Sequence, residues 1–139
     1  MEFMVQVPQE ESAPMNPAGL HVRVASSFVA RARGLLFRAT LGFDEGLLIA
    51  PCSSVHTFGM RQGIDVVFVD PLGGVLRVVP SLGPWRMASE GGSAGVLELA
   101  SGAAAYWGIA SGVVLEDLQQ ALVPRSWFAP LSRRSPEES

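Results

Sequence analysis

The residues best suited to chemistry lie in one stretch of the chain, between Cys52 and Asp70. A thiol and an imidazole, Cys52 and His56, open this stretch, and such a pair can act as nucleophile and base. In an extended segment, however, residues four positions apart lie about 13 Å apart, at about 3.3 Å per residue. Pro51 and the β-branched Val55 disfavour the helical alternative. We therefore expect Cys52 to have a structural role.

Asp65 is the second candidate, because it interrupts the apolar run of residues 64–69. A carboxylate in such surroundings must be protonated, hydrogen-bonded or paired, since an isolated buried charge is costly. Four basic side chains are candidate partners: His56, Arg61, Arg33 and Arg86. The sequence favours a structural ion pair between Asp65 and Arg33 over the alternative, in which Asp65 and His56 serve as catalytic acid and base.

A ligand-binding surface is the third candidate. Two segments combine a guanidinium with an aromatic side chain: the HTFGMR segment (residues 56–61) and the PWR loop (residues 84–86). Binding pockets commonly join a few directional polar groups to apolar walls. We expect arginines of both segments to supply charge and Phe58 and Trp85 to form walls. The candidate ligand-binding residues are His56, Thr57, Phe58, Met60, Arg61, Trp85, Arg86 and Glu98.

Several of these residues have a structural alternative. A lone histidine among apolar neighbours is often a hydrogen-bonded core residue, and a methionine often fills a gap, so His56 and Met60 also fit a packing role. Trp85 is also consistent with a structural role, as a side chain that anchors the loop by packing. Glu98 is either an acid on a strand surface or a further partner for the arginines.

Spacing excludes several familiar sites. The chain has no G-x-S-x-G elbow, no G-x-x-x-x-G-K phosphate loop, no H-E-x-x-H pair and no dinucleotide fingerprint after a predicted strand. A single cysteine excludes an intramolecular disulfide and a metal cluster built from cysteines alone. We expect no metal site and no cofactor.

The composition limits the class of protein and of partner. At 139 residues, with 48% hydrophobic and 17% charged residues, the chain fits one globular domain. No window approaches the length of a membrane-spanning helix, so we expect no membrane span. The net charge of −3 argues against a nucleic-acid partner, which requires a basic face. The oligomeric state remains open.

The ends of the chain differ from its middle. Residues 1–17 contain acids and prolines and lack the basic and apolar regions of a signal peptide. We expect a cytoplasmic protein; an exported protein whose signal is absent from this sequence is the alternative. The predicted organisation is a disordered segment at 1–17, one β-rich domain at 18–120 and a loosely ordered tail at 121–139.

Periodicity and β-branched content predict strands at residues 20–25, 46–50, 54–58, 64–70, 75–79 and 95–100, with a further strand-like edge at 111–118. Paired glycines predict a hairpin turn at 70–74. Helices are expected over residues 27–38 and, after a capping Ser101, up to Gly108. About seven short strands with one or two short helices at the edge predict a mainly β fold of α+β character, either a compact β-sandwich or an open barrel.

Six segments follow one another with characteristic gaps: RARGLLFR at 31–38, EGLLI at 45–49, HTFGMR at 56–61, IDVVFVD at 64–70, PWR at 84–86 and VLEL at 96–99. This arrangement, over roughly residues 19–118, resembles the family known as domain of unknown function 192. The resemblance implies a compact β-sandwich-like domain with a short helix, and no established activity. It places at motif positions the candidate ligand-binding residues together with Gly59 and Asp65. Departures from the family pattern fall at Leu36, Gly63, Ala100 and Val113, and the last removes an acid.

The leading functional hypothesis is a small non-enzymatic domain that binds a small polar or anionic ligand, or a partner segment. The binding cleft would lie between the HTFGMR segment and the PWR loop. One alternative is a hydrolase or lyase acting on a small molecule or glycan through Asp65 and His56. A second alternative is a structural accessory domain without a pocket.

Overall fold

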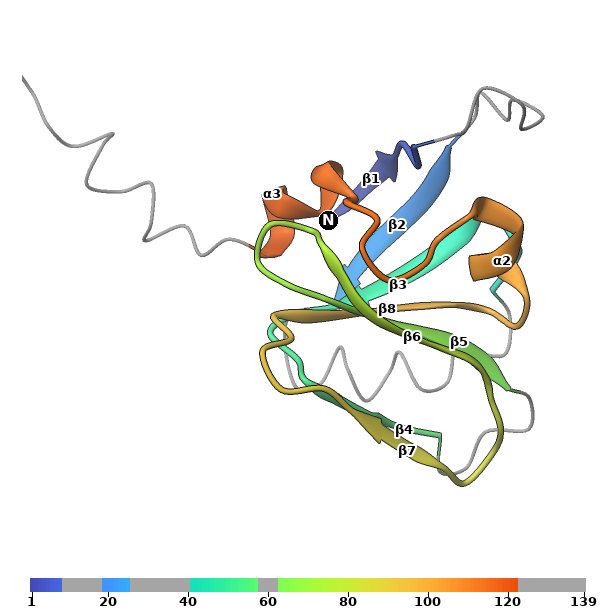
Figure 1. Ribbon diagram of the computed structural model, residues 1–139. Helices are drawn as coiled ribbons and strands as arrows, with labels where there is room; N and C mark the ends of the chain where they lie inside the picture. The colour runs from blue at the N-terminus through green and yellow to red at the C-terminus, as the bar shows by residue number, and fades with distance from the viewer. Residues whose placement is uncertain (9–18, 26–40, 58–62, 123–139) are drawn as a thin grey trace, which may run out of the picture.

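The computed structural model describes residues 1–8, 19–25, 41–57 and 63–122. The described elements, drawn in Figure 1, are β1 (Glu2–Val5), β2 (Leu20–Ala25), β3 (Glu45–Ile49), β4 (Ser54–His56), β5 (Ile64–Val69), β6 (Val75–Leu82), β7 (Met87–Ser89), β8 (Gly95–Ala100), α2 (Ala103–Trp107), the 3₁₀ helix η2 (Glu116–Leu118) and α3 (Gln119–Leu122). The helix predicted over 27–38 lies outside the described residues, as do Arg33, Phe58, Met60 and Arg61.

Six of these strands form one mixed sheet in the order β1-β2-β3-β8-β5-β6, and β4 pairs with β7 in a second, two-stranded sheet. Only the β2–β3 pair is parallel among the described strand pairs. The six-stranded sheet stays open, with β1 and β6 as its edges. The prediction of a β-rich α+β fold with a sandwich-like arrangement and short helices is therefore confirmed.

Apolar clusters cover both faces of the six-stranded sheet. Val67 and Val69 of β5 belong to the cluster that includes α2 and α3 residues, whereas Val66 and Phe68 belong to the cluster that includes β4. Because successive side chains of a strand point to opposite faces, the two clusters lie on opposite sides. Figure 1 shows the helices above the sheet and the β4–β7 pair below it. Burial on both sides explains why β5 is apolar at almost every position.

The predicted hairpin joins β5 to β6. The Asp70 carboxylate accepts hydrogen bonds from the amides of Leu72 at 2.9 Å and Gly74 at 2.8 Å, and Gly73 adopts a φ of +84°. Glycine adopts a positive φ without the steric penalty of a Cβ, so the paired glycines permit this turn. The hairpin prediction is confirmed.

The helix α2 forms where the alanine run predicted it and ends at Gly108, but the expected Ser101 cap is wrong. The residue that precedes the helix is Gly102, with no capping side chain of its own. The Ser101 hydroxyl is instead 2.5 Å from the hydroxyl of Ser81. The buried carboxylate of Asp65 takes over the cap, accepting hydrogen bonds from the amides of Gly102 and Ala104. A residue of β5, distant in the sequence, thus caps α2 in place of a neighbouring side chain.

Two predictions about the ends of the domain need correction. Residues 1–17 were expected to be disordered, yet Glu2–Val5 pair with β2 and Val5 is fully buried. The acids and prolines that suggested disorder lie mainly after residue 7, and they hid the short apolar stretch before them. Residues 111–118 form a single bridge, Gly74 to Val114, and then a 3₁₀ helix. The buried Leu115, Leu118 and Leu122 have helical spacing, which explains this outcome.

Among the described residues, no helix combines the length and the hydrophobicity that crossing a bilayer requires.

Candidate functional site

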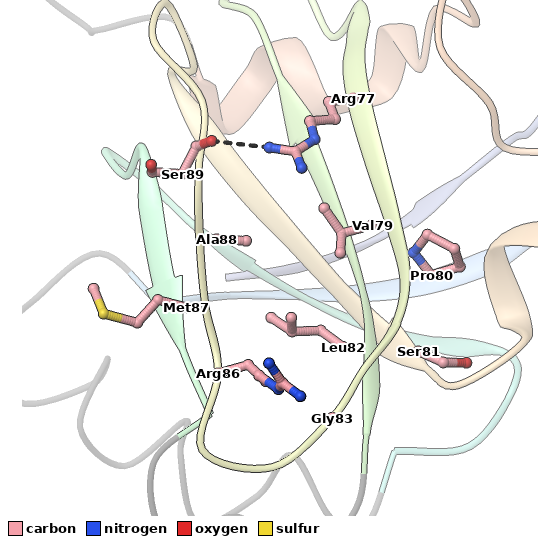
Figure 2. A pocket seen from close by; sticks show the side chains of 10 residues that line it. All are labelled: Arg77, Val79, Pro80, Ser81, Leu82, Gly83, Arg86, Met87, Ala88 and Ser89. Atoms are coloured by element: carbon pink, nitrogen blue, oxygen red, sulfur yellow. Dashed lines mark hydrogen bonds between the residues drawn. The ribbon is translucent and has the colours of Figure 1, made fainter.

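A cavity of about 750 Å³ lies between β6 and β7, and we call it the β6–β7 pocket. One wall comes from residues 77 and 79–83, and the other comes from residues 86–89 (Figure 2). The pocket therefore lies beside the open edge of the main sheet, where β6 faces the two-stranded sheet. Its volume falls within the range of small-molecule sites, about 300–1,000 Å³.

Two arginines give the β6–β7 pocket its charge. Arg77 donates from Nη1 to the carbonyl oxygen of Ser89 at 3.2 Å, and the same atom lies 4.0 Å from a carboxylate oxygen of Glu90. The guanidinium of Arg86 lies near Gly83, at the other end of the pocket (Figure 2). The residues that line the pocket include no acid. The lining is thus cationic at both ends.

The middle of the pocket is apolar. Val79 and Leu82 come from β6 and Ala88 comes from β7, and Figure 2 shows them between the two arginines. All three pack against the cluster beneath the main sheet and are only partly buried. They therefore offer hydrocarbon surface to a ligand that lies along the pocket.

Thr57 holds the loop that carries Arg86. Its hydroxyl donates to the carbonyl oxygen of Gly83 at 2.6 Å and accepts from the Arg86 amide at 2.8 Å. Its backbone amide donates to the Arg86 carbonyl at 2.9 Å, and its carbonyl accepts from the Trp85 amide at 3.1 Å. Thr57 is fully buried. The structure thus places this predicted binding residue behind the PWR loop, where it positions the loop backbone.

The segment at residues 81–86, which runs from the end of β6 into the PWR loop, contains two non-glycine residues with positive φ, Ser81 at 48° and Trp85 at 59°. Each such conformation costs about 1–3 kcal/mol and persists only where surrounding contacts enforce it. The Ser81 amide donates to Oδ1 of Asp65 at 2.8 Å, and the Trp85 amide is held by Thr57. Two buried polar residues, Asp65 and Thr57, therefore anchor the two ends of the segment at residues 81–86.

Asp65 is almost fully buried, with 1% of its surface exposed. Besides the Ser81 amide, its carboxylate accepts from the amides of Gly102 at 3.1 Å and Ala104 at 2.9 Å. Within the part of the chain that the structure describes, backbone amides thus supply the hydrogen bonds that a buried carboxylate requires. The predicted ion pair with Arg33 involves a residue outside the described ranges and stays a prediction.

The structure does not bring His56 and Asp65 together. His56 is exposed on β4, where it pairs with Met87. Asp65 contacts α2, which covers the opposite face of the main sheet. The sheet itself therefore lies between the imidazole and the carboxylate.

The remaining candidates occupy different environments. Trp85 is 68% exposed beside the pocket, whereas Glu98 is fully buried on β8, opposite Val66. Glu98 is therefore not the surface acid that was one of its two alternatives. Cys52 is buried, and its thiol donates to the Ser54 carbonyl at 3.0 Å.

Metal ligands of the usual types do not gather in the part of the chain that the structure describes. No three side chains among its His, Cys, Asp and Glu residues are arranged to hold a metal ion.

Sequence reasoning missed Arg77 and the β6 wall. One signal was present, because Pro80 lacks a backbone N–H and a proline inside a strand indicates a sheet edge. Arg77, three residues before Pro80, then lies on an edge strand, where its side chain can contribute to a surface site. The placement of β6 and β7 on opposite sides of the pocket has no comparable sequence signal.

Comparison with protein families and sequences finds relatives without assigned activity. A family model, DUF192, described as Uncharacterized ACR, matches residues 10–116. A UPF0127 protein of Pyrococcus horikoshii is 42% identical over 69 residues, which are 48% of this chain and 59% of that protein. The match thus covers less than two thirds of that relative.

Two solved structures share the fold. A Sinorhizobium meliloti protein, provisionally described as a transcription regulator, has a TM-score of 0.66 at 19% identity, over 82% of this chain and 92% of that one. A Novosphingobium aromaticivorans protein of unknown function has a TM-score of 0.59 at 25% identity, over 76% of this chain and 93% of that one.

Proposed function

We propose that this chain, which belongs to the DUF192 family, binds a small anionic ligand in the β6–β7 pocket through Arg77 and Arg86. One observation carries the proposal: two guanidinium groups border a cavity whose middle is apolar and whose lining contains no acid. The family has no assigned activity, so the features of this pocket alone support the proposed function.

The chemistry of the arginines favours an anion. A guanidinium is a planar donor of five N–H groups and accepts no hydrogen bond, so carboxylate and phosphate oxygens match it well. The Arg77–Glu90 contact is long, at 4.0 Å, and both side chains are partly exposed. Surface ion pairs of this kind contribute little stability. An incoming anion can therefore compete with Glu90 for Arg77.

The charge of the whole chain supports a small ligand. A net charge of −3 disfavours binding to a nucleic acid, whose phosphates require a broad basic surface. The transcription-regulator description belongs to a neighbour with 19% identity, and that likeness concerns the fold alone.

The proposal retains part of the cleft predicted from sequence. Arg86 comes from the PWR loop, and Thr57 from the HTFGMR segment supports its backbone. Contributions of Phe58, Met60 and Arg61 stay predictions, as do direct ligand contacts of His56, Trp85 and Glu98. The hydrolase or lyase alternative has less support, because the Asp65 carboxylate already accepts hydrogen bonds from three backbone amides.

Thermal unfolding and calorimetry test the proposal. The protein is titrated with acetate, succinate and inorganic phosphate, and with acetamide as the neutral analogue. We expect at least one anion, and not acetamide, to raise the melting temperature. Arg77→Gln and Arg86→Gln should each weaken that response.

Arg23→Gln is the matched control, because it removes one charge from β2, which three strands separate from β6. This variant should respond to the anion like the parent protein. The proposal fails if no anion acts, or if the control loses binding as much as the two pocket variants do.

A further inference from the structure

The two arginines of the β6–β7 pocket lie at opposite ends of it, with Val79, Ala88 and Leu82 between them in Figure 2. The guanidinium of Arg77 is at Ser89, to whose carbonyl oxygen it donates at 3.2 Å. The backbone of Arg86 lies three residues before Ser89, so the two backbone positions are about 10 Å apart at about 3.3 Å per residue of extended chain. Figure 2 shows its guanidinium directed toward Gly83, away from Arg77. A single carboxylate or phosphate contacts a donor at about 2.8 Å, so two anionic groups joined by a spacer match this arrangement better than one group does.

The surface between the arginines does not attract a further charge. Val79, Leu82 and Ala88 occupy it, and the hydroxyl of Ser81, which also lines the pocket, is within hydrogen-bond distance of the Ser101 hydroxyl. Burying hydrocarbon against such a surface is favourable, whereas burying an unpaired polar group is costly. The part of a ligand that lies over these residues should therefore be apolar.

Backbone recognition by strand addition is disfavoured at this edge of the sheet. Near the start of β6, the amide and carbonyl of Val75 already bond to Val113 and Gly112. Near its end, Pro80 has no amide to offer. An added strand needs a row of free backbone groups. The pocket is thus better suited to recognise a ligand through its side chains.

The spacing of the two cationic ends is set by the fold. The Arg86 backbone is fixed by hydrogen bonds with Thr57, and the Arg77 side chain is held by its hydrogen bond to the Ser89 carbonyl. Both Ser81 and Trp85 hold positive φ values between these ends. A pocket prepared in this way selects ligands by the distance between their charged groups.

We propose that the ligand is an elongated molecule with an anionic group at each end and an apolar chain between them. This inference rests on the proposed anion-binding function and adds the class of ligand. Arg77 takes one anionic group, Arg86 takes the other, and the chain lies over Val79, Leu82 and Ala88.

Calorimetry with linear carboxylates on the full chain tests this ligand class. The dicarboxylates are succinate, adipate, suberate and dodecanedioate, and hexanoate and octanoate are the monocarboxylates matched in length to adipate and suberate. We expect affinity to peak at an intermediate length. At that length, the dicarboxylate should bind about tenfold more tightly than its monocarboxylate, the gain expected from one added charge-assisted hydrogen bond.

The arginine variants locate the two ends. In Arg77→Gln and in Arg86→Gln, the preferred dicarboxylate should lose its advantage and bind like the matched monocarboxylate. Arg23→Gln should keep the full advantage. Amide chemical-shift changes in the parent protein should appear around both residue 77 and residue 86.

Two results would overturn the inference, and they differ. Equal affinity for matched mono- and dicarboxylates, with both pocket variants still weakened, would indicate a single-anion site, so that the proposed function survives without the elongated ligand. Absence of binding by every carboxylate and by phosphate would overturn the proposed function and the inference together.

Discussion

Thr57 and Arg86 exchange hydrogen bonds across 29 residues of sequence, with the Arg86 amide donating to the Thr57 hydroxyl at 2.8 Å and the Thr57 amide donating to the Arg86 carbonyl at 2.9 Å. A fully buried threonine thereby sets the position of an exposed cationic residue. The relationship explains how the PWR loop stays in place although Trp85 has an unfavourable backbone conformation. Thr57 therefore shapes the pocket from behind the PWR loop, whereas Arg86 is the residue positioned to contact a ligand.

Thr57→Val should reduce both stability and anion binding. The valine has similar shape but leaves the Arg86 amide and the Gly83 carbonyl without their hydroxyl partner. An unsatisfied buried polar group costs about 1–3 kcal/mol, so we expect a loss of that size in the free energy of unfolding. Urea denaturation measures the loss.

Thr57→Ser is the matched control, because it keeps the hydroxyl and removes one methyl group. It should retain most of the anion affinity that Thr57→Val loses. If the serine and valine variants bind anions equally, the hydroxyl does not position Arg86, whatever the change in stability.

Asp65→Asn should destabilise the fold. Both carboxylate oxygens accept backbone hydrogen bonds, one from Ser81 and the other from Gly102 and Ala104. An amide group must place its NH₂ against at least one of these donors, which costs about 1–3 kcal/mol. Chemical denaturation of this variant and of the exposed control Asp44→Asn gives the comparison, and the control should change little. A fully stable Asp65→Asn protein would contradict the structural role and revive the catalytic alternative.

Gly73→Ala tests the contact between the β5–β6 hairpin and the C-terminal elements. Gly73 has a φ of +84°, and an added Cβ would clash with the carbonyl oxygen of Leu115. We expect a loss of about 2 kcal/mol or more in the free energy of unfolding, from strain and displaced backbone together. Gly91→Ala is the control, since an added Cβ there meets no atom within 4 Å. Equal stability of the two variants would disprove the close contact.

Val5→Ala tests whether the first residues are part of the fold. The Val5 side chain is fully buried, whereas the adjacent Met4 is 43% exposed. Removing two buried methyl groups should cost about 2 kcal/mol. Met4→Ala should cost much less, although it removes more atoms. A disordered terminus predicts that neither substitution affects the melting temperature.

Local patterns in the sequence accounted for most of the strands. The alternation at residues 20–25, the β-branched run at 64–69 and the paired glycines at 73–74 each reflect neighbours along the chain, and all three led to confirmed predictions. The wrong predictions concerned segments that were judged by their overall character and not residue by residue. The strand Glu2–Val5 was hidden in a polar terminus, and the helical spacing of buried leucines after residue 111 was mistaken for a strand edge.

For the candidate site too, the sequence identified some residues, whereas their partners were visible only in the structure. From sequence alone, Asp65 was identified as a buried acid in need of partners, and Arg86 as a candidate cation, because a charge in an apolar run or beside a tryptophan is visible in a single segment. The identity of the partners was decided only by the tertiary structure. Backbone amides of Ser81, Gly102 and Ala104 satisfy Asp65, and a backbone amide carries no residue-specific signal.

The pocket also depends on tertiary contacts. Arg77 and Arg86 stand at two ends of one cavity because β6 lies at the sheet edge while β7 is held by β4. The amino-acid sequence by itself determined which segments form strands and which residues carry charge, since both follow from side-chain type and local spacing. Only the tertiary structure decided which charges face the same cavity, because that follows from pairings between strands distant in the chain.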